Sequence, residues 1–486
     1  MSKIEKKHGL KINSFFNTIK SISRLIFPLI TFPYVSRILS PEGIGKVNFA
    51  DSVVVYCAMI ANLGISSFAQ REAAKIRDDK EKLSYFSKKI LVFNIITTIL
   101  AYIVFFVLYF FVPKFSTYRS VLLILSVNII CQTLGVRWLY VALEEYQFVA
   151  IRSIIFQFIS LILLFSFVHS PEDLLIYVGI SAFSSVGSDL WNFVRSCRWV
   201  DWRKKTDYNF KPFIKPVLTL FGMNAALSIY YTLDVTLLGF LTTDSEVGYY
   251  TAANKIVRLV YSIIVSAFEV LLPRLSYLAE KEQWNKFKEY FSDGILLIIF
   301  FSIPCSVGLS CLAEPILLTF SGGAYYPAIK VLKIMTPIIV IISLANIVNN
   351  QLFLPLRKEK YSIISVCSGA TINLILNFIL IPKYGALGAG IGSILAEFTV
   401  MVVAWSLAHQ YIDLKSYVIP FIQCVLASIV MGTAVTITVH FIKINLLKML
   451  LGIIVGILVY FIILLLFKNT ILKKYILNFN FLKRGK

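Results

Sequence analysis

Long apolar segments follow one another along the chain from about residue 13 to about residue 467. Each has about 20 residues, the length that an α-helix needs to cross the hydrocarbon core of a bilayer. Hydrophobic residues make up 58% of the 486 residues and charged residues only 15%, which excludes a soluble globular protein. The sequence therefore predicts an all-α polytopic membrane protein without a separate soluble domain.

About fourteen transmembrane spans are expected at this segment length. They lie at roughly 13–36, 45–69, 90–112, 119–142, 149–168, 173–196, 214–241, 247–272, 291–313, 327–352, 361–382, 385–410, 417–441 and 446–467.

The formal net charge of +21 is concentrated in alternate connections between these spans. Basic residues cluster at 71–89, 195–215, 274–288 and 357–360, whereas the connections at 170–173 and 242–246 carry acidic residues instead. By the positive-inside rule the basic connections face the cytoplasm. An even number of spans then places both basic termini in the cytoplasm. This distribution favours topology and anionic lipid over nucleic acid as the cause of the charge.

An internal similarity links the two halves of the chain. The turn around Gly45 resembles the turn around Gly248, and Ala50 and Ala253 occupy matching positions at the same offset. Repeated bundles of this kind are typical of transporters, which bind substrate where the repeats meet. We therefore expect an N-terminal six-helix lobe (1–196), a cytoplasmic linker (197–213), a C-terminal six-helix lobe (214–411) and, at 412–486, two additional helices with a basic tail.

Several stretches resemble one family of transporters. The segment Ile30–Gly45 (ITFPYVSRILSPEGIG) and the segment Trp138–Tyr146 (WLYVALEEY), which precedes Ile151-Arg-Ser, are similar to the Wzx-type flippases of polysaccharide repeat units. The resemblance covers essentially the whole chain. It implies membership of the multidrug/oligosaccharidyl-lipid/polysaccharide exporter superfamily, with two six-helix lobes in a V around a central cavity and two C-terminal helices beyond them.

Two spans carry cations where lipid cannot solvate them. Lys20 and Arg24 follow two asparagines at helical spacing in the first span, and Lys255 and Arg258 share a face of the eighth. Such groups are functional-site candidates. If both spans face one cavity, the cations need an anionic partner, and a diphosphate accepts paired, charge-assisted hydrogen bonds from guanidinium groups. We predict that all four bind the diphosphate of a lipid-linked oligosaccharide.

Uncharged polar side chains are expected to contact the glycan, with Asn224 and Tyr231 of the seventh span as candidates. Polar side chains also join helices to one another through hydrogen bonds, and for any single residue this packing role is the stronger alternative.

Two carboxylates, Asp51 and Asp234, are candidates for coupling transport to an ion gradient. They could instead form fixed ion pairs with Arg24 or Arg258. H⁺, Na⁺ or the membrane potential acting on an anionic substrate would each supply a driving force. The scattered cysteines and histidines have no metal-ligand spacing, so no metal or other cofactor is expected.

The resemblance and the cationic spans together predict a flippase in the bacterial cytoplasmic membrane. It would move undecaprenyl-diphosphate-linked repeat units of O-antigen, capsule or exopolysaccharide to the outer leaflet, with a polysaccharide polymerase and a chain-length regulator as possible partners. A lipid II flippase is the alternative within the fold, and a drug or cation antiporter of the same superfamily is another. An enzyme is disfavoured because the outer connections are too short for acid–base machinery.

Overall fold

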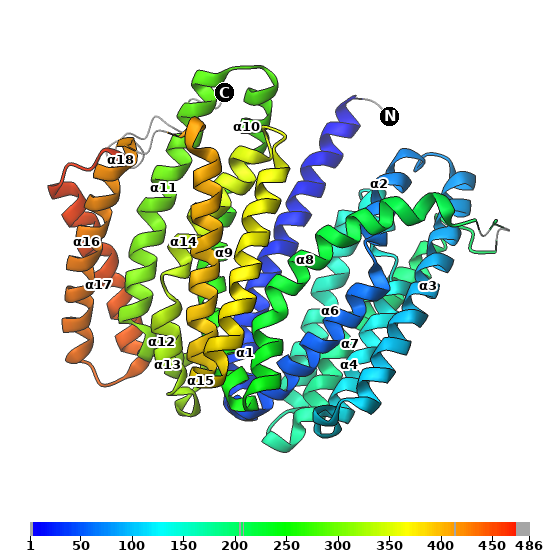
Figure 1. Ribbon diagram of the computed structural model, residues 1–486, viewed down its shortest axis with the longest axis horizontal. Coiled ribbons are helices and arrows are strands. Elements are labelled where there is room, and N and C mark those ends of the chain that lie inside the picture. Colours follow the sequence, from blue (N-terminus) through cyan, green and yellow to red (C-terminus); the bar gives the residue numbers. More distant parts are fainter. Residues whose placement is uncertain (1–2, 204–205, 208, 413–414, 473–486) are drawn as a thin grey trace. The chain divides into compact units, whose positions relative to one another are not determined.

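The computed structural model describes residues 3–203, 206–207, 209–412 and 415–472, and these contain helices but no β-strand (Figure 1). The all-α fold predicted from the sequence is confirmed. The α-helices are α1 (Lys3–Asn62), α2 (Ile65–Lys75), α3 (Lys80–Phe111), α4 (Arg119–Leu134), α5 (Arg137–Ala142), α6 (Tyr146–Phe167), α7 (Leu174–Ser196), α8 (Lys211–Leu241), α9 (Asp244–Phe268), α10 (Leu271–Glu280), α11 (Trp284–Cys311), α12 (Ala313–Ser321), α13 (Ala328–Met335), α14 (Ile338–Asn346), α15 (Glu359–Ala408), α16 (Lys415–His440), α17 (Asn445–Leu466) and α18 (Thr470–Leu472).

Within the described residues, 11 helical segments are long and apolar enough to cross a membrane. Two of them, in α1 and α15, are too long for a single crossing. At 1.5 Å per residue, the 60 residues of α1 would extend about 90 Å, three times the hydrocarbon thickness. Both helices are interrupted by one residue with non-helical backbone angles. The predicted total of fourteen spans stays a prediction.

The interruption in α1 falls at Ser40, whose φ of 59° and ψ of 173° lie outside the helical region. The next residue is Pro41, and a proline disfavours helical geometry in the residue before it. Ser23 and Thr31 before the break line the same cavity as Asp51 and Ala58 after it. The chain therefore folds back at Ser40, where the sequence predicted the turn between the first two spans.

The second interruption falls at Gly385 in α15, where a φ of 55° suits glycine. Glycines after and before this turn allow the two arms to pack closely. A Cβ on Gly388 would lie 2.3 Å from the carbonyl oxygen of Leu380, and one on Gly369 would lie 2.2 Å from Val400 Cγ2. The glycine-rich segment after Tyr384 thus forms the turn of a tightly packed helical hairpin.

The chain forms two compact units, unit 1 (residues 1–248) and unit 2 (residues 249–486). In unit 1, α1 packs against α3, α4, α6 and α8, while α7 packs against α4 and α6. In unit 2, α11 packs against α14 and α16, and α15 packs against α13 and α14. The sequence assigned α8 to the C-terminal lobe, whereas in the structure α8 packs on α1 and α2 within unit 1. The predicted lobe boundaries themselves stay a prediction.

Two glycines in unit 1 form a reciprocal backbone contact. A Cβ on Gly45 would lie 1.7 Å from the carbonyl oxygen of Asp244, and a Cβ on Gly248 would lie 2.1 Å from the carbonyl oxygen of Pro41. Pro41 is separated from Asp244 by the same number of residues as Gly45 from Gly248. The two similar turns therefore contact each other through matching positions, and only glycine leaves room for the carbonyls.

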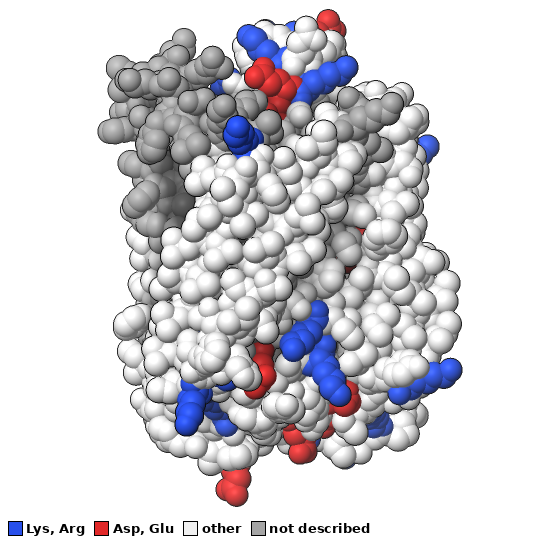
Figure 2. Space-filling model, turned by 90° about the vertical axis from the view of Figure 1, so that its left-hand side faces the viewer, with Lys and Arg blue, Asp and Glu red and all other residues white. Residues whose placement is uncertain are grey.

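The surface carries a broad apolar band. Large side chains of α16 and α17 are exposed, among them Ile437 (61%) and Leu458 (57%). Figure 2 views the molecule from the side on which Figure 1 draws these helices, and its charged side chains gather toward the two ends. This pattern fits contact with lipid, as predicted for the last two spans.

One ion pair fastens the segment after α7 to α3. Lys89 Nζ lies 2.6 Å from Asp207 Oδ1, and the Lys89 side chain is 9% exposed. The hydrogen bond from Lys89 lowers the pKa of the Asp207 carboxyl below its ordinary value of 3.8.

Candidate functional site

A polar cavity of about 590 Å³ lies inside unit 1. Its walls come from both arms of α1 and from α4, α5, α6 and α7, and we call it the unit-1 cavity. Most small-molecule sites are lined mainly by apolar side chains and measure 300 to 1,000 Å³. This cavity has such a size, but more than half of its lining residues are polar, which favours a ligand rich in hydrogen-bonding groups.

One end of the unit-1 cavity holds a bidentate ion pair between α5 and α7. Arg137 Nε lies 2.7 Å from Asp189 Oδ1, and Arg137 Nη2 lies 2.7 Å from Asp189 Oδ2. Asp189 is completely buried, whereas the Arg137 side chain is 52% exposed. Gly135 permits this arrangement, because a Cβ there would lie 2.5 Å from Asp189 Oδ1. The carboxylate is thus satisfied while part of the guanidinium remains accessible.

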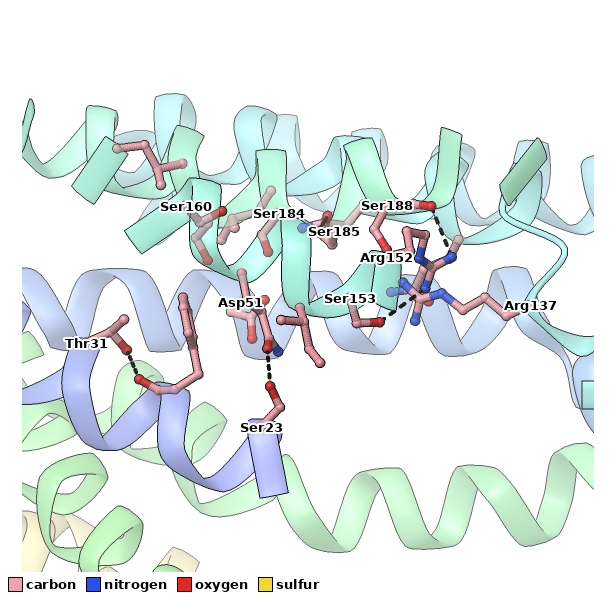
Figure 3. A pocket seen from close by; sticks show the side chains of 18 of the residues that line it. Ser23, Thr31, Asp51, Arg137, Arg152, Ser153, Ser160, Ser184, Ser185 and Ser188 are labelled. Atoms are coloured by element: carbon pink, nitrogen blue, oxygen red, sulfur yellow. Dashed lines mark hydrogen bonds between the residues drawn. The ribbon is translucent and has the colours of Figure 1, made fainter. Parts of the chain in front are cut away.

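A second arginine, Arg152 of α6, lies beside this pair and is only 5% exposed. Its Nη1 donates to the carbonyl oxygen of Ser188 at 3.1 Å and to Oδ1 of Asn192, and its Nη2 lies 3.5 Å from Ser153 Oγ. All three acceptors are uncharged. Figure 3 shows the side chains of Arg137 and Arg152 converging at this end of the cavity.

The wall between the helices is rich in hydroxyl groups. Serines recur along one face of α7 at intervals of three and four residues, which is helical spacing. The cavity-lining residues of α7 include Ser181, Ser184, Ser185, Ser188 and Asn192. Ser185 donates to Asn128 Oδ1 of α4, so some of these groups also join helices. Hydroxyl and amide groups arranged in this way can bind sugar hydroxyls.

The α1 side of the cavity carries Asp51 and Ser23. Ser23 Oγ donates to Gln157 Oε1 of α6 at 3.0 Å. Asp51 lines the cavity away from the two arginines (Figure 3). The placement of Asp51 in a polar cavity is compatible with the predicted coupling role, which stays a prediction.

The other sequence-predicted residues of unit 1 are distributed over α1 and α8. The side chains of Lys20, Arg24 and Asn224 lie outside the described part of the structure. Tyr231 is 61% exposed, and its ring centroid lies 5.8 Å from that of Tyr230. Asp234 is half-buried on α8 and does not line the unit-1 cavity.

Two predicted cations, Lys255 and Arg258, lie on α9 in unit 2. Lys255 is exposed. Arg258 is 35% exposed, and its Nη2 lies 3.6 Å from Oε1 of Glu397 on α15, which is 9% exposed. An acidic neighbour of Arg258 is therefore present on the same unit. The acidic partners expected from the sequence were Asp51 and Asp234, so Glu397 is a partner that the sequence did not predict.

Sequence reasoning missed the arginine end of the unit-1 cavity. Arg152 lies near the start of a span, where an arginine usually reaches the headgroups. A signal was present in the hydroxyl stripe of α7, because serines at i, i+3, i+4 and i+7 on a transmembrane helix mark a polar face. Asp189, one position after Ser188, lies next to that face.

Comparisons with known proteins give a consistent assignment. The model of a family described as "Polysaccharide biosynthesis protein" matches residues 10–279, and that of the MatE family matches residues 220–379. A putative O-antigen transporter of Escherichia coli K12 is 24% identical over 397 residues, which cover 80% of this chain and 94% of that protein. A capsular polysaccharide biosynthesis protein of Staphylococcus aureus is 23% identical over 79% of this chain and 95% of its own length.

Among solved structures, the lipid II flippase MurJ in an inward closed conformation has the same fold. Its TM-score is 0.77 at 18% identity, with 93% of this chain and 98% of that chain covered.

Proposed function

Because the chain belongs to the polysaccharide biosynthesis protein family, we propose that it is a flippase for undecaprenyl-diphosphate-linked oligosaccharide repeat units. It moves repeat units of O-antigen, capsule or exopolysaccharide from the cytoplasmic to the outer leaflet by alternating access. The observation that carries the proposal is the similarity, over about 80% of this chain, to a putative O-antigen transporter and a capsular polysaccharide biosynthesis protein. The polar unit-1 cavity, set in an apolar membrane protein, supports it.

In this proposal, Lys20, Arg24, Lys255 and Arg258 bind the diphosphate, whose oxygens match the planar fork of a guanidinium group. Asn224 and Tyr231 contact the glycan, and the polyprenyl chain stays in the lipid.

The energy source in the proposal is an H⁺ or Na⁺ gradient coupled through Asp51 or Asp234, or the membrane potential. The potential contributes about 2.3 kcal/mol per charge per 100 mV and draws a bound anion outward.

The protein acts without catalysing a covalent reaction. It resides in the bacterial cytoplasmic membrane with both termini in the cytoplasm, and it delivers its substrate to a polysaccharide polymerase and a chain-length regulator.

The experiment is complementation of a strain lacking this gene, with surface polysaccharide as the readout. Wild-type protein restores the polymer. Arg24→Ala abolishes it at unchanged protein level in the membrane, and Arg24→Lys retains part because an ammonium cannot form the planar fork. Lys473→Ala, in the basic tail, is the matched control and complements fully. Full polymer output from Arg24→Ala would refute the diphosphate assignment, and failure of the wild-type protein would refute the function.

A lipid II flippase is the second candidate, favoured by the fold shared with MurJ. Purified protein in liposomes separates the two. Translocation of a prenyl-diphosphate repeat unit but not of lipid II supports the proposed function, and the reverse result selects the alternative. Binding of an organic cation in place of both would indicate an antiporter.

A further inference from the structure

The arginine end of the unit-1 cavity carries one positive charge beyond what its own acid neutralises. Arg137 is paired with Asp189 through two hydrogen bonds. Arg152 is only 5% exposed, and it donates to two side-chain oxygens of uncharged residues and to one backbone carbonyl. Asp189 also attracts Arg152, but one carboxylate shared by two guanidinium groups compensates a buried cation only in part, which is costly. A bound anion would remove that cost.

The geometry of the two guanidinium groups indicates where the anion would bind. Arg152 Nη1 donates to Ser188 and Asn192, while Nη2 makes only the 3.5 Å contact with Ser153 and the buried Nε has no partner among the described residues. Arg137 commits Nε and Nη2 to Asp189, and its half-exposed side chain leaves donors toward the cavity. Guanidinium groups bind carboxylates and phosphates through adjacent N–H donors of this kind.

The rest of the cavity suits a sugar ring attached to that anion. Serine hydroxyls line α7, and Asn128, Gln132 and Gln157 add amide groups. A volume of about 590 Å³ accommodates a ligand larger than a free ion. The single excess positive charge at the arginine end matches a monoanionic carboxylate better than a diphosphate, which carries at least two charges, and Asp51 elsewhere in the cavity disfavours a second negative charge.

We propose that the unit-1 cavity binds an acidic sugar residue, with its carboxylate held between Arg137 and Arg152 and its hydroxyls on the serine stripe of α7. The inference rests on the proposed flippase function and specifies its substrate class as repeat units that contain a uronic acid. The site differs from the proposed diphosphate site, because neither arginine belongs to the four cations assigned there.

The test is saturation-transfer difference NMR with purified full-length protein in detergent and methyl β-D-glucuronide as the probe. We expect saturation transfer to the glucuronide and at least about tenfold weaker binding of methyl β-D-glucoside, which lacks the carboxylate. Arg152→Gln should lose glucuronide binding by about the same factor, whereas Arg71→Gln, a matched change at an arginine whose side chain is 70% exposed, should leave it unchanged.

A second variant keeps the inference testable if Arg152→Gln fails to fold. Ser153→Asp places a carboxylate next to Arg152 Nη2, so it should occupy the arginine and abolish glucuronide binding while retaining the buried cation. Equal binding of glucuronide and glucoside, retained binding in Ser153→Asp, or displacement of the glucuronide by equimolar inorganic pyrophosphate would overturn the assignment. Complementation separates a failure of the acidic-sugar site from a failure of the flippase function. If the wild-type protein restores polysaccharide but does not bind glucuronide, only the acidic-sugar site is refuted.

Discussion

The reciprocal contact of Gly45 and Gly248 predicts a large effect from the smallest possible side chain. In Gly45→Ala the new Cβ would lie 1.7 Å from the carbonyl oxygen of Asp244, half of the 3.4 Å at which ordinary van der Waals contact begins. The obstacle is backbone, which cannot rotate away as a side chain can. Overpacking of this kind costs typically 1–3 kcal/mol, and we expect about 3 kcal/mol here.

The assay is thermal unfolding of purified protein in detergent, followed by loss of the monodisperse peak in size-exclusion chromatography. We expect Gly45→Ala to lower the midpoint by about 5 °C. Gly179→Ala on α7 is the control, because a Cβ there meets no atom within 4 Å and alanine favours a helix by about 1 kcal/mol. A Gly45→Ala midpoint equal to that of Gly179→Ala would refute the close-contact reasoning.

Gly248→Ala tests the reciprocity of the same contact. Its Cβ would lie 2.1 Å from the Pro41 carbonyl oxygen, so the loss should be large but smaller than for Gly45→Ala. Separating the two turns relieves both clashes, so the double variant should lose less than the sum of the single losses. If the stability loss of the double variant equals the sum of the two single losses, one movement of the turns does not relieve both clashes.

Three further predictions concern charged groups. Asp189→Asn removes the charged partner of Arg137, which is half-exposed, and should destabilise the protein by about 1.5–3 kcal/mol, measured by the same unfolding assay; an unchanged midpoint would contradict the role of the ion pair. Glu397→Gln distinguishes two roles of Arg258: if Arg258 binds substrate, polysaccharide output persists in this variant and is lost in Arg258→Gln, whereas equal losses would indicate a fixed ion pair. The folded-state pKa of Asp207 lies below its ordinary value, so its contribution to stability is present above about pH 4 and is lost as the pH falls through the lowered pKa. Asp207→Asn should therefore reduce the acid sensitivity of the unfolding midpoint below about pH 4, and an unchanged pH profile would contradict this.

The helical framework could be predicted from the sequence because lipid imposes a simple rule. Every backbone polar group in a membrane needs a partner within the protein, so an apolar run of sufficient length has to be a helix. The interruptions at Ser40 and Gly385 were also predictable, because proline after Ser40 and a glycine-rich turn after Tyr384 are local signals. These features depend on neighbours in the sequence alone.

The arginine end of the unit-1 cavity depends on neighbours that are distant in the sequence. Arg152 has the local sequence of a headgroup-facing residue, and its burial results from the packing of α6 against α7. Asp189 has the local sequence of an isolated acid in a span, and its partner lies on α5. A contact between two residues that are far apart in the sequence leaves no periodic pattern in either helix. Hydrophobic periodicity alone therefore could not identify the arginine end of the cavity.

The turns around Gly45 and Gly248 are similar in sequence and also contact each other. From the sequence alone the match had a simple alternative, since many turns before a membrane helix contain glycine. The structure adds that each glycine contacts the carbonyl of the residue four positions before the other. Contacts of this reciprocal kind arise when equivalent segments are related by a two-fold axis, because one operation generates both. Any two antiparallel turns would give such a pair of contacts, but here the contacts also have the register that the sequence match of Ala50 with Ala253 predicts, and this agreement favours an internal repeat as the origin of the similarity.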